Sequence, residues 1–246
     1  MRARLDTDGY AMIRSFLSRD DVDTAYDFIL QSLRERLPLA PKGPIQKNIG
    51  LINRQDVATA EPLRRITEHK SLYELLERLL GEEVITTGFK WLRAVGIKEF
   101  TGVHMDRVFL GGSSRMLTVW IPISKCPTWC GPIMVARGSH KDPAYAEIQR
   151  TYGESKVGAD GTASGWLYDD GSALARDLGR EVEWKSANFW PGDILILDSR
   201  VLHMTATNVS EEMRISCDTR WQPRSDPRDP KITSWHAQPP DMPPAC

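Results

Sequence analysis

The spacing of apolar residues in the N-terminal part of the chain predicts helices. After a short apolar run at 10–16, Ser18 is a typical N-cap for a helix whose first turn is acidic. Apolar side chains then recur at spacings of three and four, which predicts one buried helix face and an end before Pro38. They are Val22, Tyr26, Ile29, Leu30 and Leu33.

A second helix is predicted further along, where leucines recur on one side: Leu72, Leu75, Leu76, Leu79 and Leu80. Gly81 follows directly and is a natural residue to end the helix in the left-handed conformation. Residues 38–60, between the two helices, contain Pro41, Gly43 and Pro44 and show little periodicity. We therefore expect a loop there.

From Val84 onward the pattern changes to short runs of β-branched and aromatic residues, separated by turns that contain glycine and proline. The predicted strands are 84–89, 92–97, 116–123, 133–136, 194–197 and 214–221. No helical pattern lies between successive strands, which favours an antiparallel sandwich or barrel over a βαβ fold. Helices followed by strands predict a mainly β jelly roll supported by an N-terminal helical layer.

Residues 141–183 interrupt the strands and are rich in Gly, Asp, Ser and Tyr. We expect this segment to pass over the mouth of the barrel. Loops of such length often serve as active-site lids or binding loops, and a tolerated insertion remains an alternative. The loop at 38–60 is a second candidate for a place beside the active site.

Composition sets the broad class. The 246 residues are 41% hydrophobic and 26% charged, with a formal net charge of −1, which fits a single domain over 1–246. Near neutrality argues against nucleic acid and membrane surfaces as partners and leaves small molecules, while the oligomeric state stays open. Residues 1–9 carry both charge signs and no stretch is apolar enough to span a membrane, so a cytoplasmic location is expected.

The four cysteines are too few and too scattered for a disulfide framework and are expected to be reduced. Cys126 and Cys130 have a spacing seen in metal sites. A structural zinc needs about four ligands, however, and no second cluster lies near them in the sequence. Zinc binding is therefore disfavoured.

Another pair carries more chemical information. His104 and Asp106 are two residues apart, and on a strand such residues point to the same face. A third ligand, His203, follows the apolar run at 194–197 and a turn. Two histidines and one carboxylate form the facial arrangement that holds Fe(II) and leaves coordination positions open for a 2-oxo acid and O₂. Taken alone, a histidine on a strand is more often a hydrogen-bonded structural residue.

Arg214 strengthens the metal hypothesis, because it stands eleven residues after His203 with Asn208 and Ser210 between them. A turn at the asparagine and serine would fold the chain into a hairpin and return Arg214 beside the metal. Its planar guanidinium could then bind a carboxylate with two hydrogen bonds. The alternative is a weak surface ion pair with Glu211 or Glu212.

Four segments carry a pattern when they are taken in order. They are Asp8-Gly-Tyr-Ala-Met-Ile with Phe16-Leu-Ser; His104-Met-Asp106; Val119-Trp-Ile-Pro-Ile with Cys130-Gly-Pro-Ile and Arg137-Gly-Ser-His-Lys; and Pro191-Gly-Asp through His203, Asn208 and Arg214. This pattern resembles the phytanoyl-CoA dioxygenase family of Fe(II)- and 2-oxoglutarate-dependent oxygenases. The resemblance covers most of the chain, apart from 38–60, 141–183 and the tail after Pro223.

This resemblance implies a cupin-like double-stranded β-helix, with iron on His104, Asp106 and His203 and the distal carboxylate of 2-oxoglutarate on Arg214. It also implies that Thr205 hydrogen-bonds this carboxylate and that Trp120 lines the co-substrate pocket, with Thr87 as a further candidate. The chain departs from the family pattern at Ala136-Arg137, where a proline-containing turn is usual. We expect His140 to brace this turn rather than to act as a fourth ligand.

The expected reaction consumes 2-oxoglutarate and O₂, releases succinate and CO₂, and hydroxylates an unactivated C–H bond. The carboxylate of Asp106 disfavours halogenation, whereas desaturation, ring closure and demethylation stay open. We expect a small polar or amphipathic metabolite of secondary metabolism, such as an amino-acid derivative or a natural-product intermediate. Its candidate contacts are Arg93, Arg107, Trp129, Trp166 and Tyr168.

Two other classes of protein remain as alternatives. One is a cupin-like metal enzyme that does not use 2-oxoglutarate, and the other is a catalytically silent binding module. Arg214 argues against the first, because such an enzyme needs no carboxylate clamp in its pocket. The intact set of His104, Asp106, His203 and Arg214 argues against the second.

Overall fold

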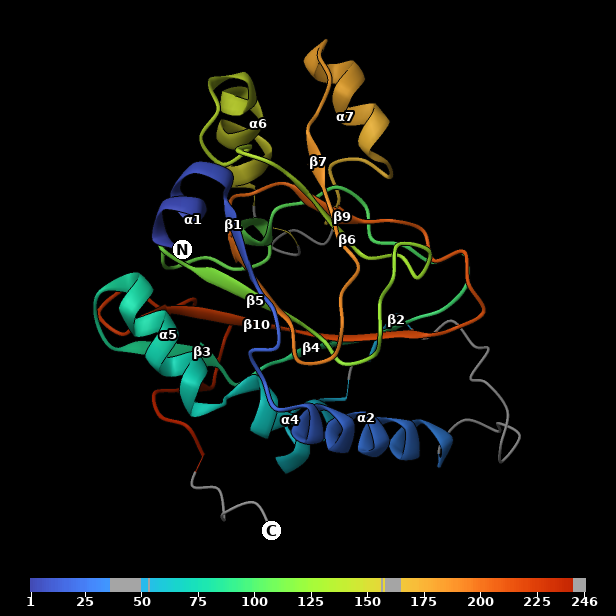
Figure 1. Ribbon diagram of the computed structural model, residues 1–246. Helices are drawn as coiled ribbons and strands as arrows, with labels where there is room; N and C mark the ends of the chain where they lie inside the picture. Colours follow the sequence, from blue (N-terminus) through green and yellow to red (C-terminus); the bar gives the residue numbers. More distant parts are fainter. Residues whose placement is uncertain (36–49, 53, 156, 158–164, 241–246) are drawn as a thin grey trace.

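The computed structural model describes residues 1–35, 50–52, 54–155, 157 and 165–240. Two antiparallel sheets face each other, with helices outside them (Figure 1). The helices α2, α4 and α5 lie on one side of β5 and β10, whereas α6 and α7 lie beyond the smaller sheet. Among the described helices, none is both long and apolar enough to cross a membrane.

The elements follow one another in a largely helical first part and a largely extended second part. The helices are α1 (Arg2–Asp8), α2 (Arg19–Arg34), α3 (Gln55–Ala58), α4 (Glu61–Thr67), α5 (Lys70–Leu80), α6 (Ala146–Arg150) and α7 (Gly171–Leu178), with 3₁₀ turns η1 (Asp106–Val108), η2 (Pro143–Tyr145) and η3 (Tyr152–Glu154). The strands are β1 (Tyr10–Ile13), β2 (Gly50–Leu51), β3 (Val84–Thr87), β4 (Trp91–Val95), β5 (Leu117–Pro122), β6 (Ile133–Ala136), β7 (Trp184–Lys185), β8 (Ile194–Asp198), β9 (His203–Thr205), β10 (Arg214–Pro223) and β11 (Trp235–His236).

The larger sheet has the order β1-β8-β5-β10-β3-β11, and β4 pairs with both β10 and β2. The smaller sheet has the order β7-β6-β9. Two facing antiparallel sheets form the jelly roll that was predicted, and α2, α4 and α5 support the outer face of the larger sheet.

Both predicted helices are confirmed, and their end signals act as expected. The Ser18 hydroxyl accepts a hydrogen bond from the backbone N–H of Asp21 at the start of α2. At the other helix, Gly81 ends α5 with a φ of 85° and donates its N–H to the carbonyl of Glu77. The apolar faces of α2 and α5 pack with α4 against the larger sheet.

Side chains alternate along β10, because successive residues of a strand point to opposite faces of the sheet. Ile215, Cys217 and Trp221 belong to the apolar core under the helices. The residues between them face the space between the two sheets and are polar: Arg214, Ser216, Asp218 and Arg220. The inner face of β10 therefore brings buried charge into the middle of the molecule.

Three expectations about loops and turns need correction. The loop predicted at 38–60 is wrong in its described part, which contains β2 and α3, while residues 36–49 and 53 lie outside the described residues. The hairpin predicted between His203 and Arg214 is also wrong, because β9 pairs with β6 in the smaller sheet while β10 lies in the larger one. In its described residues, segment 141–183 holds α6, α7, η2 and η3, so it is not a loop without secondary structure of its own.

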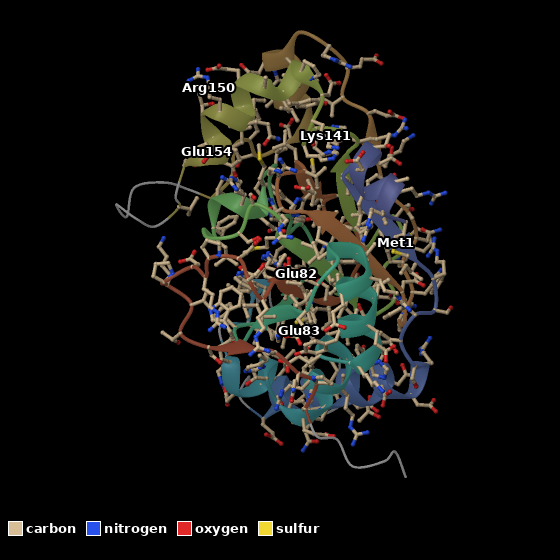
Figure 2. The ribbon with its side chains drawn as sticks, turned by 90° about the vertical axis from the view of Figure 1, so that its left-hand side faces the viewer. Met1, Glu82, Glu83, Lys141, Arg150 and Glu154 are labelled. Carbon is tan, nitrogen blue, oxygen red and sulfur yellow. The ribbon has the colours of Figure 1, made fainter. Side chains whose placement is uncertain are left out.

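Segment 141–183 packs against residues 103–108, which include His104 and Asp106. Backbone hydrogen bonds join Val157 to Val108 at 2.9 Å and Leu167 to Val103 at 2.7 Å. Figure 2 places Arg150 and Glu154 of this segment at one end of the molecule, away from Glu82 and Glu83 after α5. Its role as an active-site lid stays a prediction.

Candidate metal centre

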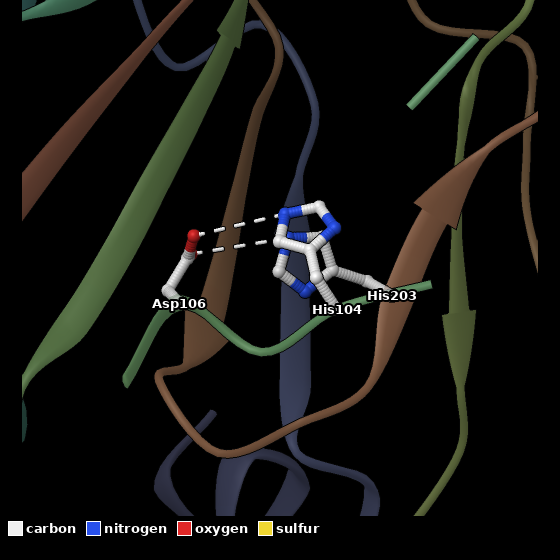
Figure 3. A group of neighbouring side chains, drawn as sticks. All are labelled: His104, Asp106 and His203. Carbon is white, nitrogen blue, oxygen red and sulfur yellow. Dashed lines mark ion pairs between the residues drawn. The ribbon is translucent and has the colours of Figure 1, made fainter. Parts of the chain in front are cut away.

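Three metal-ligating side chains converge between the two sheets (Figure 3). His104, Asp106 and His203 are buried, and one ligand atom from each lies within 4.8 Å of the others. Nε2 of His104 is 4.0 Å from Oδ1 of Asp106, and Nε2 of His203 is 3.9 Å from Oδ2. Over the described residues this is the one cluster of three or more such groups. Its donor set is that of a mononuclear site with two histidines and one carboxylate.

The backbone that carries these groups differs from the predicted strand. His104 lies in an isolated β-bridge with His203, and Asp106 begins the 3₁₀ turn η1. Met105 between them is extended, with φ −115° and ψ 142°. One extended residue is enough to turn the side chains of His104 and Asp106 to the same side, so the expected convergence holds although the expected strand does not.

Both histidines are held in the tautomer that suits a metal ligand. Nδ1 of His104 lies 2.8 Å from the carbonyl oxygen of Gly102, and Nδ1 of His203 lies 3.1 Å from that of Val201. A carbonyl can only accept, so each Nδ1 carries the proton and each Nε2 keeps its lone pair. Burial is the largest cause that lowers the pKa of His104, to about 3.

Asp106 is held by two donors at once. The Thr118 hydroxyl donates to Oδ2 at 2.5 Å, and Nη2 of Arg220 donates to Oδ1 at 2.7 Å. Burial favours the protonated carboxyl, but the positive charge of Arg220, the two histidines and the hydrogen bond from Thr118 together outweigh this effect and hold the pKa of Asp106 below its ordinary value. The group is therefore an anion at neutral pH, as a metal ligand must be.

A small pocket joins this cluster to Arg214. Its lining includes the three residues of the cluster and the predicted co-substrate residues Thr205, Trp120 and Arg214. Arg214 is fully buried and donates through Nη1 to the carbonyl of Gly131, while Nε and Nη2 have no partner. The alternative of a surface ion pair with Glu211 or Glu212 is wrong, because no part of Arg214 reaches solvent.

The predicted substrate contacts divide into two groups. Arg93 lines the pocket beside the metal cluster, with Nε 3.2 Å from Oδ2 of Asp218. Four others lie outside the lining. Arg107 pairs with Glu154 at 3.0 Å, and Trp129 is 57% exposed. The Trp166 ring packs at a tilt against Phe100, and Tyr168 forms a β-bridge with Val103.

Four other residues considered in the sequence lie outside the lining of the metal pocket. The Thr87 hydroxyl donates to the carbonyl of Phe89, and Thr87 does not line the pocket. His140 bonds through Nε2 to the carbonyl of Asp6 at 3.1 Å and is not in the metal cluster, which agrees with a bracing role. Cys126 and Cys130 are buried free thiols.

Thr118, Asp218 and Arg220 were missed in the sequence. Thr118 and Arg220 are direct partners across β5 and β10, and both bond to Asp106. The signal was present: polar residues occupy every second position of β10 from Arg214 to Arg220, and apolar residues occupy most of the others. This alternation is typical of a strand with one polar face, and it could have pointed to Asp218 and Arg220. Thr118 lies on β5, and the register of β5 and β10 places it opposite Arg220.

A wider groove of about 570 Å³ lies elsewhere, between α2 and residues 211–215. It holds none of the buried histidines, and no metal-ligating cluster lines it within the described chain. This groove is larger than the pocket at the metal cluster. The chemistry of the side chains selects the smaller pocket around His104.

A jelly roll with two histidines and one carboxylate between its sheets defines a mononuclear non-haem metalloenzyme. The chain belongs to the phytanoyl-CoA dioxygenase family, whose sequence profile matches residues 5–216. This membership, with the His104, Asp106 and His203 cluster, confirms the predicted class: an oxygenase that depends on Fe(II), 2-oxoglutarate and O₂.

Among relatives, the chain is 27% identical over 259 residues to 1-deoxypentalenic acid 11-beta-hydroxylase of Streptomyces exfoliatus, with 94% of this chain and 83% of the relative covered. The enzyme of that name from Streptomyces arenae is also 27% identical, over 250 residues, with the same coverage. These two relatives are similar along nearly the whole length of this chain.

Solved structures agree on the fold. The non-haem α-ketoglutarate-dependent carbocyclase SnoK from nogalamycin biosynthesis has a TM-score of 0.66 at 18% identity, covering 93% of this chain and 85% of that one. EctD from S. alaskensis has a TM-score of 0.63 at 20% identity, covering 90% and 75%. Likenesses at this identity confirm the cupin-like double-stranded β-helix.

Proposed function

We propose that this chain hydroxylates an unactivated C–H bond of a small natural-product intermediate, using iron held by His104, Asp106 and His203. Arg214 would bind the distal carboxylate of 2-oxoglutarate. The observation that carries the proposal is the buried guanidinium of Arg214, with two unpartnered N–H groups, in the pocket that the three metal-ligating residues line.

The unpartnered atoms of Arg214 are Nε and Nη2, which share one edge of the guanidinium. This edge offers two parallel N–H groups, the arrangement that pairs with both oxygens of a carboxylate. Burying a cation without an anionic partner costs free energy, and an anionic ligand that binds the cation would offset this cost. Gly131 holds the third nitrogen through its carbonyl and fixes the direction of the free edge.

Thr205 and Trp120 support the same ligand. The Thr205 hydroxyl accepts from the backbone N–H of Thr101 at 2.8 Å, which leaves its own proton free to be donated to a carboxylate. Trp120 packs edge-on against Phe189, with ring centroids 4.9 Å apart, and this contact fixes one wall of the pocket. Together these residues would orient an acid whose other end reaches the metal.

Bound iron and 2-oxoglutarate supply the oxidising chemistry, with release of succinate and CO₂. The chain's own residues bind, orient and exclude water. The carbonyls of Gly102 and Val201 keep the two histidines in the metal-binding tautomer. Asp106 supplies a negative charge with no proton to lose, and its presence disfavours halogenation, which needs this position vacant.

For the substrate, we propose a small amphipathic metabolite with an acidic group near Arg93. Arg93 lines the pocket while Asp218 holds its Nε, so its terminal N–H groups are available to a ligand. The similarity to a 1-deoxypentalenic acid hydroxylase supports a carboxylic acid of secondary metabolism. A single domain, a cytoplasmic location and the absence of nucleic-acid or membrane partners stay predictions.

One experiment separates this proposal from its rivals. Protein purified without oxygen is titrated with Fe(II) and then with 2-oxoglutarate, and the weak visible band of the chelated complex is recorded. The band is expected in the wild-type chain. Iron binding without the band would favour a cupin-like enzyme that does not use 2-oxoglutarate, and the absence of iron binding would favour a silent binding module.

The substrate class needs a second measurement. Candidate carboxylic acids and amino-acid derivatives are screened for succinate release above the rate without substrate. We expect stimulation by small amphipathic acids and a weaker response from their methyl esters. Turnover with long acyl-CoA thioesters alone would overturn the proposed substrate class.

A further inference from the structure

Arg220 is the second arginine on the inner face of β10, and its environment is unlike that of Arg214. It is 2% exposed, and its guanidinium carbon lies 4.4 Å from the centre of the Trp91 ring. Nη2 donates to Oδ1 of Asp106 at 2.7 Å, whereas the other nearby carboxylate, Asp218, is 4.0 Å away. Arg220 therefore has one close anionic partner, and this partner belongs to the metal cluster.

Stability alone does not account for this arginine. Nε and Nη1 of Arg220 are buried and have no hydrogen-bond partner. A buried ion pair gains little net stability even with full hydrogen bonding, because both charges leave water. A guanidinium that makes one of its five possible hydrogen bonds adds little to the stability of the fold. Its function is therefore to be sought at the carboxylate that it contacts, that of Asp106.

Thr118 completes the arrangement from the neighbouring strand. Thr118 and Arg220 face each other in the register of β5 and β10, and the carboxylate of Asp106 lies over this pair. Each carboxylate oxygen receives one hydrogen bond, Oδ1 from Arg220 and Oδ2 from Thr118. The carboxylate thus has a fixed orientation, with each oxygen about 4 Å from a different histidine: 4.0 Å to Nε2 of His104 and 3.9 Å to Nε2 of His203.

We infer that Arg220, with Thr118 opposite it, is a positioning residue that holds Asp106 in the orientation required for metal binding. The inference rests on the proposed role of Asp106 as a metal ligand. The two arginines of β10 would then have different roles: Arg214 binds the co-substrate, and Arg220 orients the metal ligand Asp106.

The test measures metal affinity with Co(II), whose visible absorption reports its coordination. Arg220→Met keeps bulk and removes the charge, Arg220→Lys keeps the charge, and Thr118→Val removes the second hydrogen bond without changing the shape. Removing a residue that hydrogen-bonds to a metal ligand typically lowers metal affinity by about 10- to 100-fold. We expect a loss of this size and an altered Co(II) spectrum in Arg220→Met, with smaller changes in the other two variants.

Lys90→Met is the matched control. Lys90 is also fully buried and pairs with a buried carboxylate, that of Glu68 at 3.1 Å, but neither residue lines the metal pocket. This variant should lose stability and keep the wild-type Co(II) affinity and spectrum.

Two results would overturn the positioning role. One is wild-type affinity and spectrum in the Arg220 and Thr118 variants. The other is an equal loss of affinity in Lys90→Met, since it would mark a general effect of stability. If Arg220→Met does not fold, Arg220→Lys and Thr118→Val decide by the same criteria. Failure of the wild-type chain to bind Co(II) is a different outcome, because it would remove the proposed metal site itself.

Discussion

His104 and His203 face each other across an antiparallel bridge, in which the backbone N–H of each donates to the carbonyl of the other at 2.9 Å. Their rings lie with centroids 4.2 Å apart. The backbone thus fixes the spacing of two ligands from distant parts of the chain before any metal binds. Asp106 takes no part in this bridge, and hydrogen bonds from Thr118 and Arg220 hold its carboxylate instead.

Replacing Asp106 by alanine should abolish Fe(II) binding and succinate release, because two neutral imidazoles without the carboxylate leave a weak site. Anaerobic Fe(II) titration and a succinate assay measure both effects. Asp193→Ala is the control: Asp193 is equally buried but pairs with Arg14, and the backbone N–H groups of Ser15 and Trp190 donate to it. This control should lose about 1 to 3 kcal/mol of stability and still bind iron. Full activity in Asp106→Ala would remove the assignment of the metal cluster.

Much of the fold was accessible to sequence reasoning because it rests on local signals. The 133–136 run is β6 residue for residue, and Gly81 ends α5 as predicted. Errors arose where pairing is decided by tertiary contacts. A turn at Asn208 suggested a hairpin, yet β9 and β10 join different sheets, because β9 pairs with β6 and β10 pairs with β4 and β5.

The candidate site shows the same division. His104, Asp106, His203 and Arg214 have distinctive chemistry at recognisable spacings, and the structure brings them to one pocket. Which charged residues reach this pocket depends on tertiary contacts, such as the pairing of β4 with β10 and the contact of Arg107 with segment 141–183, and these cannot be read from local sequence. Hence Arg93 lines the pocket while Arg107 turns to Glu154.

Arg214→Met should have opposite effects on co-substrate binding and on stability. Loss of a buried partner for a carboxylate typically costs about 2 kcal/mol or more, so the dissociation constant for 2-oxoglutarate should rise by about 30-fold or more. In the metal-free chain without 2-oxoglutarate, removing the unpartnered Nε and Nη2 should raise the free energy of unfolding by about 1 to 3 kcal/mol. Titration of the visible band and urea unfolding measure the two quantities.

The reverse pattern would count against a carboxylate clamp. An Arg214→Met chain that is less stable and binds 2-oxoglutarate like the wild type would make Arg214 a structural residue. Arg214→Lys is an informative companion, because it keeps the charge but loses the two-pronged edge. We expect it to recover only part of the affinity.

His140→Gln should keep wild-type Fe(II) affinity, because His140 lies outside the metal cluster. Its Nε2 instead bonds to the carbonyl of Asp6, and burial lowers the pKa of the imidazole. We expect a loss of stability of about 1 kcal/mol, the usual net value of one such hydrogen bond. Anaerobic Fe(II) titration checks the affinity, and weaker iron binding at wild-type stability would restore His140 as a fourth ligand.

The fold should also lose stability in acid, because Glu68 becomes protonated. Glu68 is a fully buried carboxylate that does not line the metal pocket. Burial raises its pKa, but hydrogen bonds and charges from His236, Lys90 and Arg64 outweigh that effect and lower the pKa from 4.5 to about 2. The ionised group therefore stabilises the folded chain above pH 4.5, and this stability is lost as the pH falls toward 2. The contribution is on the order of 3 kcal/mol.

Urea unfolding at pH 5 and pH 3 measures how far the free energy of unfolding falls between the two pH values. We expect a smaller fall in Glu68→Gln than in the wild type. Glu74 is an exposed acid on α5, so Glu74→Gln should show the same fall as the wild type. Equal drops in all three proteins would show that Glu68 does not contribute to the acid sensitivity of this fold.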